Sequence, residues 1–323
     1  MPGGQSSQFA QQAELLAGLT LQQRARQLAH GLYLGSHRSA SRGDGVEFAG
    51  HRPYSPGDDL RRLDRHALAR HGRYLIREFE TESERALHVV VDASPSMNYA
   101  PAGQGESKLD RAILLAAASL LIARKTQDPI GLTILGPQPR SWLPSRRTEA
   151  LPLYFSQLEQ LEHQATQTRQ STKTGQTKPH PEAKKYAQAL PRELEFLGER
   201  LPRGANLLFL SDFWQENLTL LLQSLGLLQT SRRTALALRI LTPDEINFEF
   251  QGSTRFIDPV SGLSVESDAG SSRQEYLKAL LAHSQQVDRE LAQRGVGFES
   301  FSTQSDPASN LEQAFLSLGR IYQ

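Results

Sequence analysis

The chain has 323 residues, and its 36 Lys and Arg residues against 35 Asp and Glu residues give a net charge of +1. That balance excludes the basic excess expected of a dedicated nucleic-acid-binding protein. The sequence contains no cysteine, which excludes disulfide frameworks, zinc–thiolate sites and cysteine nucleophiles. The length indicates two domains, or one large domain with attachments.

The longest apolar run extends from Ala112 to Ala123 and is closed by Arg111 and Arg124. A membrane-spanning helix needs about 20 such residues, so the run predicts a buried core helix and no membrane span. The N-terminal residues have neither a charged region nor an apolar core of the kind that secretory signals carry. We therefore expect a cytoplasmic protein.

The first two segments of the chain differ in character. Residues 1–34 are expected to be helical, with a helix over Ala10–His30. Residues 35–86 contain ten Arg, nine acidic residues and no Lys, a balance that favours internal ion pairs or a protein-facing surface. The ranges Val46–Arg52 and Tyr74–Phe79 predict strands, so this segment is expected to form a small β-rich accessory region.

The third segment, residues 87–323, alternates apolar strands with helices, which predicts an α/β fold with a mostly parallel sheet and helices on both faces. The predicted strands are Leu87–Asp92, Pro129–Leu135, Asn206–Asp212, Thr234–Leu241 and Val296–Phe301. The predicted helices are the one from the capping box at Ser107 through Lys125, then Thr148–Gln160, Glu182–Arg200, Leu218–Gln229, Arg273–Arg294 and Asn310–Ile321. Two ranges interrupt the pattern: a polar, mobile loop at 164–180 and a β-hairpin insertion at 246–268.

Polar side chains follow two of these strands at the point where each strand ends. The first strand ends at Asp92, and Ser94 and Ser96 follow it directly. The third strand ends at Asp212. Ligands of open α/β sheets bind beyond the carboxyl ends of the strands, and carboxylate and hydroxyl oxygens suit Mg²⁺, Mn²⁺ or Ca²⁺. The four residues therefore predict a divalent cation site, although Asp, Ser and Pro after a strand are also ordinary turn formers.

Two stretches resemble known families. The run DASPSM, Asp92–Met97, resembles the metal-ion-dependent adhesion site of von Willebrand factor A domains. The range Gly43–Glu80 resembles the signature of the bacterial domain-of-unknown-function family fifty-eight, and weaker similarity continues to the C-terminus. The matching signature residues are Glu47, Phe48, Arg52, Tyr54, Gly57, Asp58, Asp59, Arg61, Asp64, Ala69 and Arg70. The resemblance implies a von Willebrand factor A-like, Rossmann-like fold and a MoxR-type AAA+ ATPase as partner in the assembly or maturation of protein complexes.

The chain departs from both patterns. The family usually has Trp after the Asp of its Arg-x-x-Asp motif, where this chain has Arg65. The adhesion site normally takes a Thr from a second loop, and this chain has Lys184 and Lys185 where that Thr is sought. A lysine near a divalent cation opposes its binding. The signature residues themselves have two interpretations, a partner-binding surface or a structural tie between the segment and the domain.

Three functions follow from these residues. The leading hypothesis is a non-catalytic adaptor in which Asp92, Ser94, Ser96 and Asp212 hold a divalent cation and a carboxylate of a partner protein completes its coordination. The first alternative is a metal-assisted phosphohydrolase, because an Asp at a strand end can be a nucleophile. The second alternative is a scaffold whose metal site has decayed. The sequence has no Gly-Lys dipeptide and hence no P-loop, so nucleotide hydrolysis would belong to a partner.

Overall fold

The computed structural model describes residues 18–36, 48–54, 64, 66–67, 70, 72, 74–79, 86–101, 106–173, 183–230 and 233–318. At its centre lies a six-stranded sheet in the order β10-β7-β6-β3-β4-β5. The strands are β3 (Leu87–Asp92), β4 (Ile130–Leu135), β5 (Arg140–Ser145), β6 (Asn206–Ser211), β7 (Thr234–Leu241) and β10 (Gly297–Ser302). All neighbours pair in parallel except β4 and β5, which are antiparallel. The predicted α/β class with a mostly parallel sheet is confirmed.

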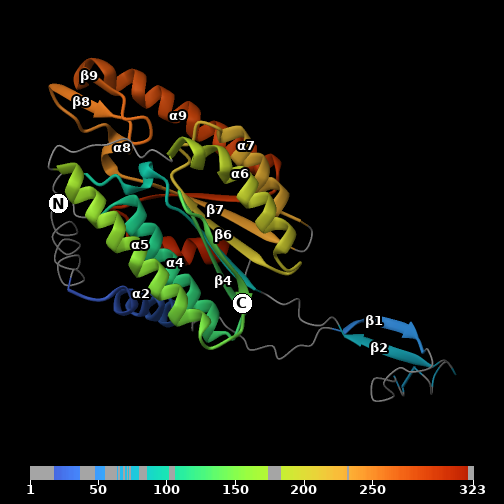
Figure 1. Cartoon of the computed structure of the whole chain (residues 1–323). Coiled ribbons are helices and arrows are strands. Elements are labelled where there is room, and N and C mark those ends of the chain that lie inside the picture. Colours follow the sequence, from blue (N-terminus) through green and yellow to red (C-terminus); the bar gives the residue numbers. More distant parts are fainter. Residues whose placement is uncertain are drawn as a thin grey trace.

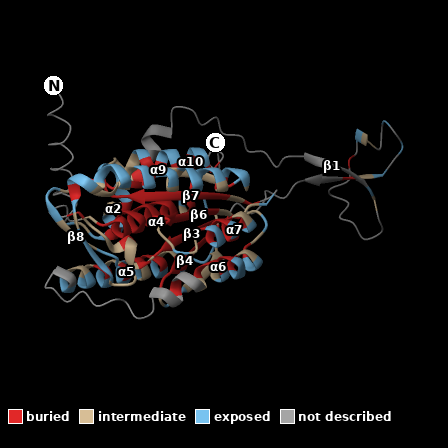
Figure 2. Ribbon diagram, turned by 90° about the horizontal axis from the view of Figure 1, so that it is seen from above, coloured by how far each residue is buried: buried red, intermediate tan, exposed pale blue. Residues whose placement is uncertain are grey.

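Helices cover both faces of the sheet (Figure 1). Helices α2 (Leu21–Ser36), α4 (Lys108–Lys125), α5 (Ala150–Lys173) and α10 (Pro307–Ser317) contribute to one apolar core. Helices α6 (Ala183–Arg200), α7 (Leu218–Leu228) and α9 (Ala269–Gln293) contribute to the other. Because successive residues of a strand point to opposite faces, Val89 and Val91 of β3 enter the first core and Val90 enters the second. Figure 2 shows the buried residues concentrated on the sheet and on the helix surfaces that face it.

Helix α4 follows β3 and is the most deeply buried helix of the fold. It begins at the predicted capping box, in which the Ser107 hydroxyl accepts from the Asp110 backbone N–H and the Asp110 carboxylate accepts from the Ser107 backbone N–H. Its residues from Lys108 to Ala123 are buried, as expected for an apolar run packed between a sheet and other helices. No helix in the part of the chain that the structure describes is long and apolar enough to cross a membrane.

Helix α5 is longer than the sequence predicts and overturns the expected start of the polar loop. The helix continues from Gln160 to Lys173, so residues 164–173 are helical, while 174–180 lie outside the described residues. The hydroxyls of Thr166 and Thr168 donate to backbone carbonyls one turn earlier. Arg169 reaches across to Asn98, Ser107 and Asp110. Residues 164–173 have few apolar side chains, so the polar contacts of Arg169 stabilise this end of the helix on the rest of the fold.

Four further elements differ from the expected pattern. Helix α2 begins at Leu21 and passes through Gly31 to Ser36, later at both ends than the predicted range, of which residues 10–17 lie outside the described residues. Strand β5, at the antiparallel edge, and helix α8 (Pro243–Asn247) were not predicted. Proline within the predicted helix Glu182–Arg200 indicates a break or kink, yet α6 is helical from Ala183 to Arg200 with Pro191 inside it.

Two small antiparallel ribbons accompany the central sheet. Strands β8 (Ser253–Ile257) and β9 (Ser264–Asp268) form a hairpin within the range 246–268. Its Phe256 ring stacks on Phe248, and Phe248 also contacts Tyr276 of α9, which joins the hairpin to the helix. Strands β1 (Phe48–Pro53) and β2 (Leu75–Phe79) pair within the accessory segment, close to the predicted ranges. The division into three segments stays a prediction.

Candidate functional site

Adjacent parallel strands bring two carboxylates to one edge of the sheet. Asp92 ends β3, Asp212 follows β6, and both residues are fully buried. Burial, together with the negative charge of Asp212, raises the pKa of Asp92 to about 6. Part of this rise is offset by the hydrogen bonds that Asp92 accepts. The two acidic groups therefore interact electrostatically.

Both oxygens of the Asp92 carboxylate are occupied by hydrogen-bond donors. Oδ1 accepts from the Ser94 backbone N–H at 2.9 Å and from the Tyr186 hydroxyl at 2.7 Å. Oδ2 accepts from the Ser211 hydroxyl at 2.6 Å and from Gln215 Nε2 at 2.5 Å. A carboxylate offers about four lone-pair sites, and four donor groups face them here, although the single Tyr186 hydroxyl proton is shared with the Leu135 carbonyl oxygen at 3.0 Å.

The Asp212 carboxylate is neutralised by a buried lysine. Lys108 Nζ lies 2.8 Å from Asp212 Oδ2 and 2.5 Å from Glu245 Oε1. Burial alone would lower the pKa of Lys108, but the two carboxylates outweigh this effect and raise it. Lys108 therefore stays charged. Its ammonium group lies beside Asp212, where the sequence predicts a divalent cation.

The two carboxylates find their partners on opposite faces of the sheet. Tyr186 belongs to α6, which packs in the second core, whereas Lys108 begins α4, which packs in the first. Alternation along parallel strands explains this arrangement, because Asp92 follows the direction of Val90, while Asp212 follows that of Leu210. Sharing an edge thus does not place two strand-end residues on the same face.

The predicted serine ligands lie close together beside Asp92. The hydroxyls of Ser94 and Ser96 are 3.1 Å apart, and Ser94 is buried. The single-turn 3₁₀ helix η2 (Pro95–Asn98) follows Ser94 directly and fixes both positions.

As arranged, the four predicted ligands do not fit a divalent cation. Four donor groups face the Asp92 carboxylate, Asp212 is ion-paired, and the ammonium of Lys108 would repel a second cation. In the described part of the chain, no cluster of three or more His, Cys, Asp or Glu side chains is arranged to hold a metal ion. The shared cation stays a prediction.

Five residues of this cluster were not predicted as site residues: Lys108, Tyr186, Ser211, Gln215 and Glu245. Two signals could have found them. Lys108 begins a helix whose long apolar run predicts burial, and a buried charge needs a partner. Tyr186 directly follows Lys184 and Lys185, in the segment where the missing Thr is sought, and its hydroxyl supplies a contact to Asp92. The side chains of the two lysines lie outside the described residues.

The structure places only part of the predicted signature. Asp64 is buried, and its Oδ1 accepts from the backbone N–H groups of His66 and Ala67, a structural role. Tyr54 packs against Tyr74 with ring centres 6.5 Å apart, and Arg70 is exposed. Gly57, Asp58, Asp59, Arg61 and the side chain of Arg52 lie outside the described residues.

Fold and site together define an α/β protein with a mostly parallel sheet and an internally paired acidic cluster at the carboxyl edge of that sheet. The chain belongs to the family described as protein of unknown function DUF58, whose model matches residues 50–286. This is the bacterial domain-of-unknown-function family whose signature the range Gly43–Glu80 resembles, so the predicted family is confirmed.

Relatives with similar sequences occur in mycobacteria. Uncharacterized protein Rv1480 of Mycobacterium tuberculosis (strain ATCC 25618 / H37Rv) is 26% identical over 293 residues, which cover 89% of this chain and 83% of the relative. Uncharacterized protein Mb1516 of Mycobacterium bovis shows the same identity and coverage.

Solved structures show a weaker similarity. The crystal structure of conserved hypothetical protein BatB from Bacteroides thetaiotaomicron is 9% identical with a TM-score of 0.43, and the match covers 73% of this chain and 99% of that one. An aerotolerance-related membrane protein from Bacteroides fragilis is 15% identical with a TM-score of 0.41, over 73% of this chain and 100% of that one.

Proposed function

We propose that the chain is a non-catalytic, von Willebrand factor A-like adaptor in the cytoplasm that binds a protein partner without needing a metal ion. The observation that carries the proposal is the internal pairing of both strand-end carboxylates. Asp92 accepts four hydrogen bonds and Asp212 is bound by Lys108, so neither acts as a nucleophile or a general base. The partner that the family resemblance implies is a MoxR-type AAA+ ATPase.

The Lys108 ammonium performs the structural role that a cation would otherwise have. It joins the start of α4, the loop after β6 and helix α8 through Asp212 and Glu245. A buried ion pair of this kind fixes the relative position of the three elements. The proposal therefore corresponds to a scaffold with a lysine in place of the predicted Mg²⁺, Mn²⁺ or Ca²⁺ ion.

The β8–β9 hairpin offers a surface for the partner. It exposes Leu263 by 73% and Val265 by 64%, two positions apart and hence on one face of the ribbon. Large aliphatic side chains gathered on one exposed ribbon are typical of protein interaction sites.

A pull-down from native cell extract tests the partner and the metal together. The tagged wild type is compared with Leu263→Ser/Val265→Ser, and Leu227→Ser serves as the control because Leu227 is equally exposed but lies on α7. We expect a MoxR-type AAA+ ATPase with the wild type and the control, in buffer and in excess chelator, and its loss with the double variant. Failure to recover such an ATPase under either condition contradicts the partner class.

Calorimetry distinguishes the lysine-based site from the predicted metal site. Titration of Mg²⁺ or Mn²⁺ into the wild type is expected to give no binding heat. Binding heat that disappears in Asp92→Ala, together with ATPase recovery that is lost in chelator, would restore the cation held by Asp92, Ser94, Ser96 and Asp212. Metal-dependent turnover of a phosphate ester that Asp92→Asn abolishes would favour the hydrolase instead.

A further inference from the structure

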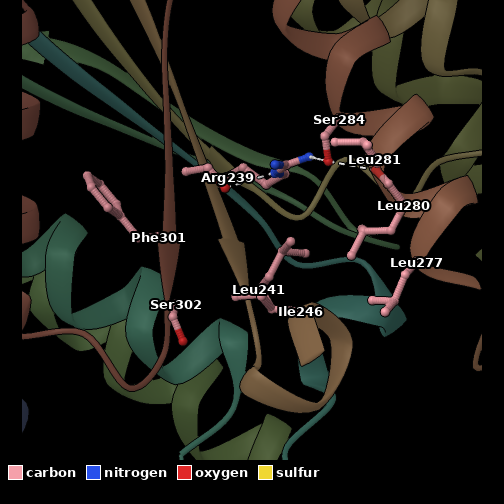
Figure 3. Close-up of a pocket in the computed structure, with 10 residues that line it drawn as sticks. Arg239, Leu241, Ile246, Leu277, Leu280, Leu281, Ser284, Phe301 and Ser302 are labelled. Carbon is pink, nitrogen blue, oxygen red and sulfur yellow. Dashed lines mark hydrogen bonds between the residues drawn. The ribbon is translucent and has the colours of Figure 1, made fainter. Parts of the chain in front are cut away.

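A cavity of about 480 Å³ lies between the carboxyl ends of β7 and β10 and the helices α8 and α9 (Figure 3). One part of its wall is aliphatic and comprises Leu241, Ile246, Leu277, Leu280 and Leu281. Figure 3 shows Leu277 and Leu280 pointing from α9 toward Leu241 and Ile246. The other part of the wall is polar and comprises Arg239, Ser284, Ser300 and Ser302. The cavity thus combines a guanidinium group with an aliphatic wall.

Arg239 stands in an unusual place for an arginine, the interior of a parallel sheet. Its neighbours in register are Ser211 on β6 and Ser300 on β10. The residue is only 7% exposed. Its Nε donates to the Ser300 hydroxyl at 3.0 Å and its Nη1 to the Ser284 hydroxyl at 2.8 Å. These contacts orient the guanidinium at the cavity wall.

The buried charge of Arg239 has no counter-ion among the described residues. Its contacts there are two neutral hydroxyls and the Phe298 ring, 5.4 Å from the guanidinium carbon. Burial lowers the pKa of Arg239, while the more distant Asp288 and Glu245 act in the opposite direction without forming an ion pair. Glu245 is committed to Lys108. Arginine is rarely buried in this way unless it is paired.

We propose that this cavity binds a small aliphatic carboxylate, with its carboxylate group on the Arg239 guanidinium and its hydrocarbon chain along the leucines of α9. The Nη2 group makes no hydrogen bond to a described residue and is available to a ligand. A guanidinium pairs with a carboxylate through charge-assisted, often bidentate hydrogen bonds. The volume lies within the usual range for small-molecule sites, about 300–1,000 Å³.

The position in the fold supports a ligand site. Arg239 lies near the carboxyl end of β7, two strands away from Asp92 in the order of the sheet. Ligands of open α/β sheets bind beyond this edge, above all at the switch point, which in this sheet lies between β3 and β6. The strand-end carboxylates are occupied internally, so the cavity beside Arg239 is the part of the edge that still offers an unsatisfied charge.

Calorimetric titration of the full chain with octanoate tests the proposal, with 1-octanol as the neutral probe of equal chain length. We expect saturable binding of one octanoate per chain and at least tenfold weaker binding of 1-octanol. Arg239→Gln should weaken octanoate at least about tenfold, the loss of one charge-assisted contact. Equal binding of both probes, or no binding of octanoate, overturns the proposal.

A second variant keeps the test valid if Arg239→Gln fails to fold. Leu281 lines the cavity but is exposed, so Leu281→Asp places a repelling carboxylate at the cavity with little effect on packing. It should weaken octanoate, whereas Leu316→Asp, at an exposed leucine of α10, should not. Octanoate affinity unchanged by Leu281→Asp contradicts the site. Binding of a peptide that ends in leucine, without binding of octanoate, would assign the cavity to a protein partner.

Discussion

The hydrogen bonds around Asp92 accommodate two protonation states. The Tyr186 hydroxyl donates to Asp92 or to the Leu135 carbonyl oxygen, and in the second arrangement it can accept from a protonated Asp92. Gln215 presents Nε2 to Asp92, and its Oε1 is buried without a partner among the described residues. Turning that amide would bring Oε1 against a protonated Asp92 as an acceptor. The surrounding groups can therefore serve both protonation states of Asp92, whose pKa is raised to about 6 by burial and by the charge of Asp212.

The raised pKa of Asp92 predicts a pH dependence of stability. In the unfolded chain Asp92 loses its proton near its ordinary pKa, but in the folded chain it does so only near pH 6. The folded state therefore binds more protons between about pH 4 and 6, and the Asp92 contribution to the free energy of unfolding falls as the pH rises through this window. Asp92→Asn removes that contribution. The free energy of unfolding of the variant minus that of the wild type should therefore rise from pH 4 to 6 and stay constant above pH 6.

Urea unfolding at several pH values measures this difference. Other titrations, such as that of buried His88, occur in both proteins and cancel in the comparison. A stability difference that is constant from pH 4 to 7 would show that the pKa of Asp92 is not raised.

The ion pair at Lys108 predicts a large loss of stability on its removal. Lys108→Met leaves the fully buried Asp212 carboxylate without its cation, at a cost of about 3–5 kcal/mol in the free energy of unfolding. Adding Asp212→Asn should recover part of the loss, because it removes the uncompensated charge. Chemical denaturation checks both variants, and Lys278→Met, at an exposed lysine of α9, serves as the control. Equal stability of Lys108→Met and Lys278→Met would be incompatible with this ion pair.

Gly131 of β4 leaves room for the buried side chain of His88 on the neighbouring strand β3. His88 is fully buried, and its Nε2 lies 2.8 Å from the Thr133 hydroxyl. A Cβ at Gly131, its register partner, would lie 2.3 Å from His88 Nδ1 and 2.9 Å from the Pro144 backbone nitrogen. Burial lowers the pKa of His88 to about 3, so the ring is neutral, and its Nδ1 is buried without a hydrogen-bond partner among the described residues.

Gly131→Ala should therefore destabilise the fold by about 1–3 kcal/mol through overpacking. The same change made in a His88→Ala background should cost less, because one of the two obstructing groups is gone. Thermal or chemical unfolding of the four proteins of this cycle gives the coupling energy. Equal costs in both backgrounds would mean that His88 does not constrain Gly131.

The strands and helices with a strong local signal could be predicted from the sequence, and those that depend on distant contacts could not. The uniformly apolar β3 and the capping box of α4 carry their own signals. Strand β5 is half-exposed and has an ordinary sequence, and it forms because β4 provides an edge. The end of α5 depends on Arg169 finding partners around Ser107 and Asp110.

The candidate site shows the same limit. The sequence predicts which residues reach the carboxyl edge, because that follows from strand ends and the parallel arrangement. It does not predict which face each side chain takes, since strand β6 ends one residue before Asp212 and β3 ends at Asp92. Nor does it reveal that Lys108, the first residue of α4, balances the charge of Asp212 from more than a hundred residues earlier in the chain.

The chain outside the family match contributes to the same core. The match begins at residue 50 and ends at 286, yet Leu21 and Leu28 of α2 and Phe315 of α10 are buried in the core that α4 forms with the sheet. Arg24 of α2 also pairs with Glu162 of α5 at 2.6 Å. The matched range is therefore not a complete packing unit.

Deletion of residues 1–36 should lower the thermal unfolding temperature by about 5 °C or more. The estimate takes the loss of a single buried leucine as the minimum cost. Deletion of residues 1–17 is the control, because it leaves every described element in place. Circular dichroism during heating distinguishes the two, and identical melting curves for the longer and the shorter deletion would contradict packing of α2 on α4.

The ammonium of Lys108 has a mechanical consequence. It links the first residue of α4 to Glu245, whose other oxygen holds the backbone of Thr242 at the start of α8. Helix α8 ends at Asn247, and its C-cap residue Phe248 is stacked on Phe256 of the hairpin. A force that pulls on the hairpin therefore acts on α4 through these contacts. We expect the hairpin and α4 to unfold together when the chain is stretched.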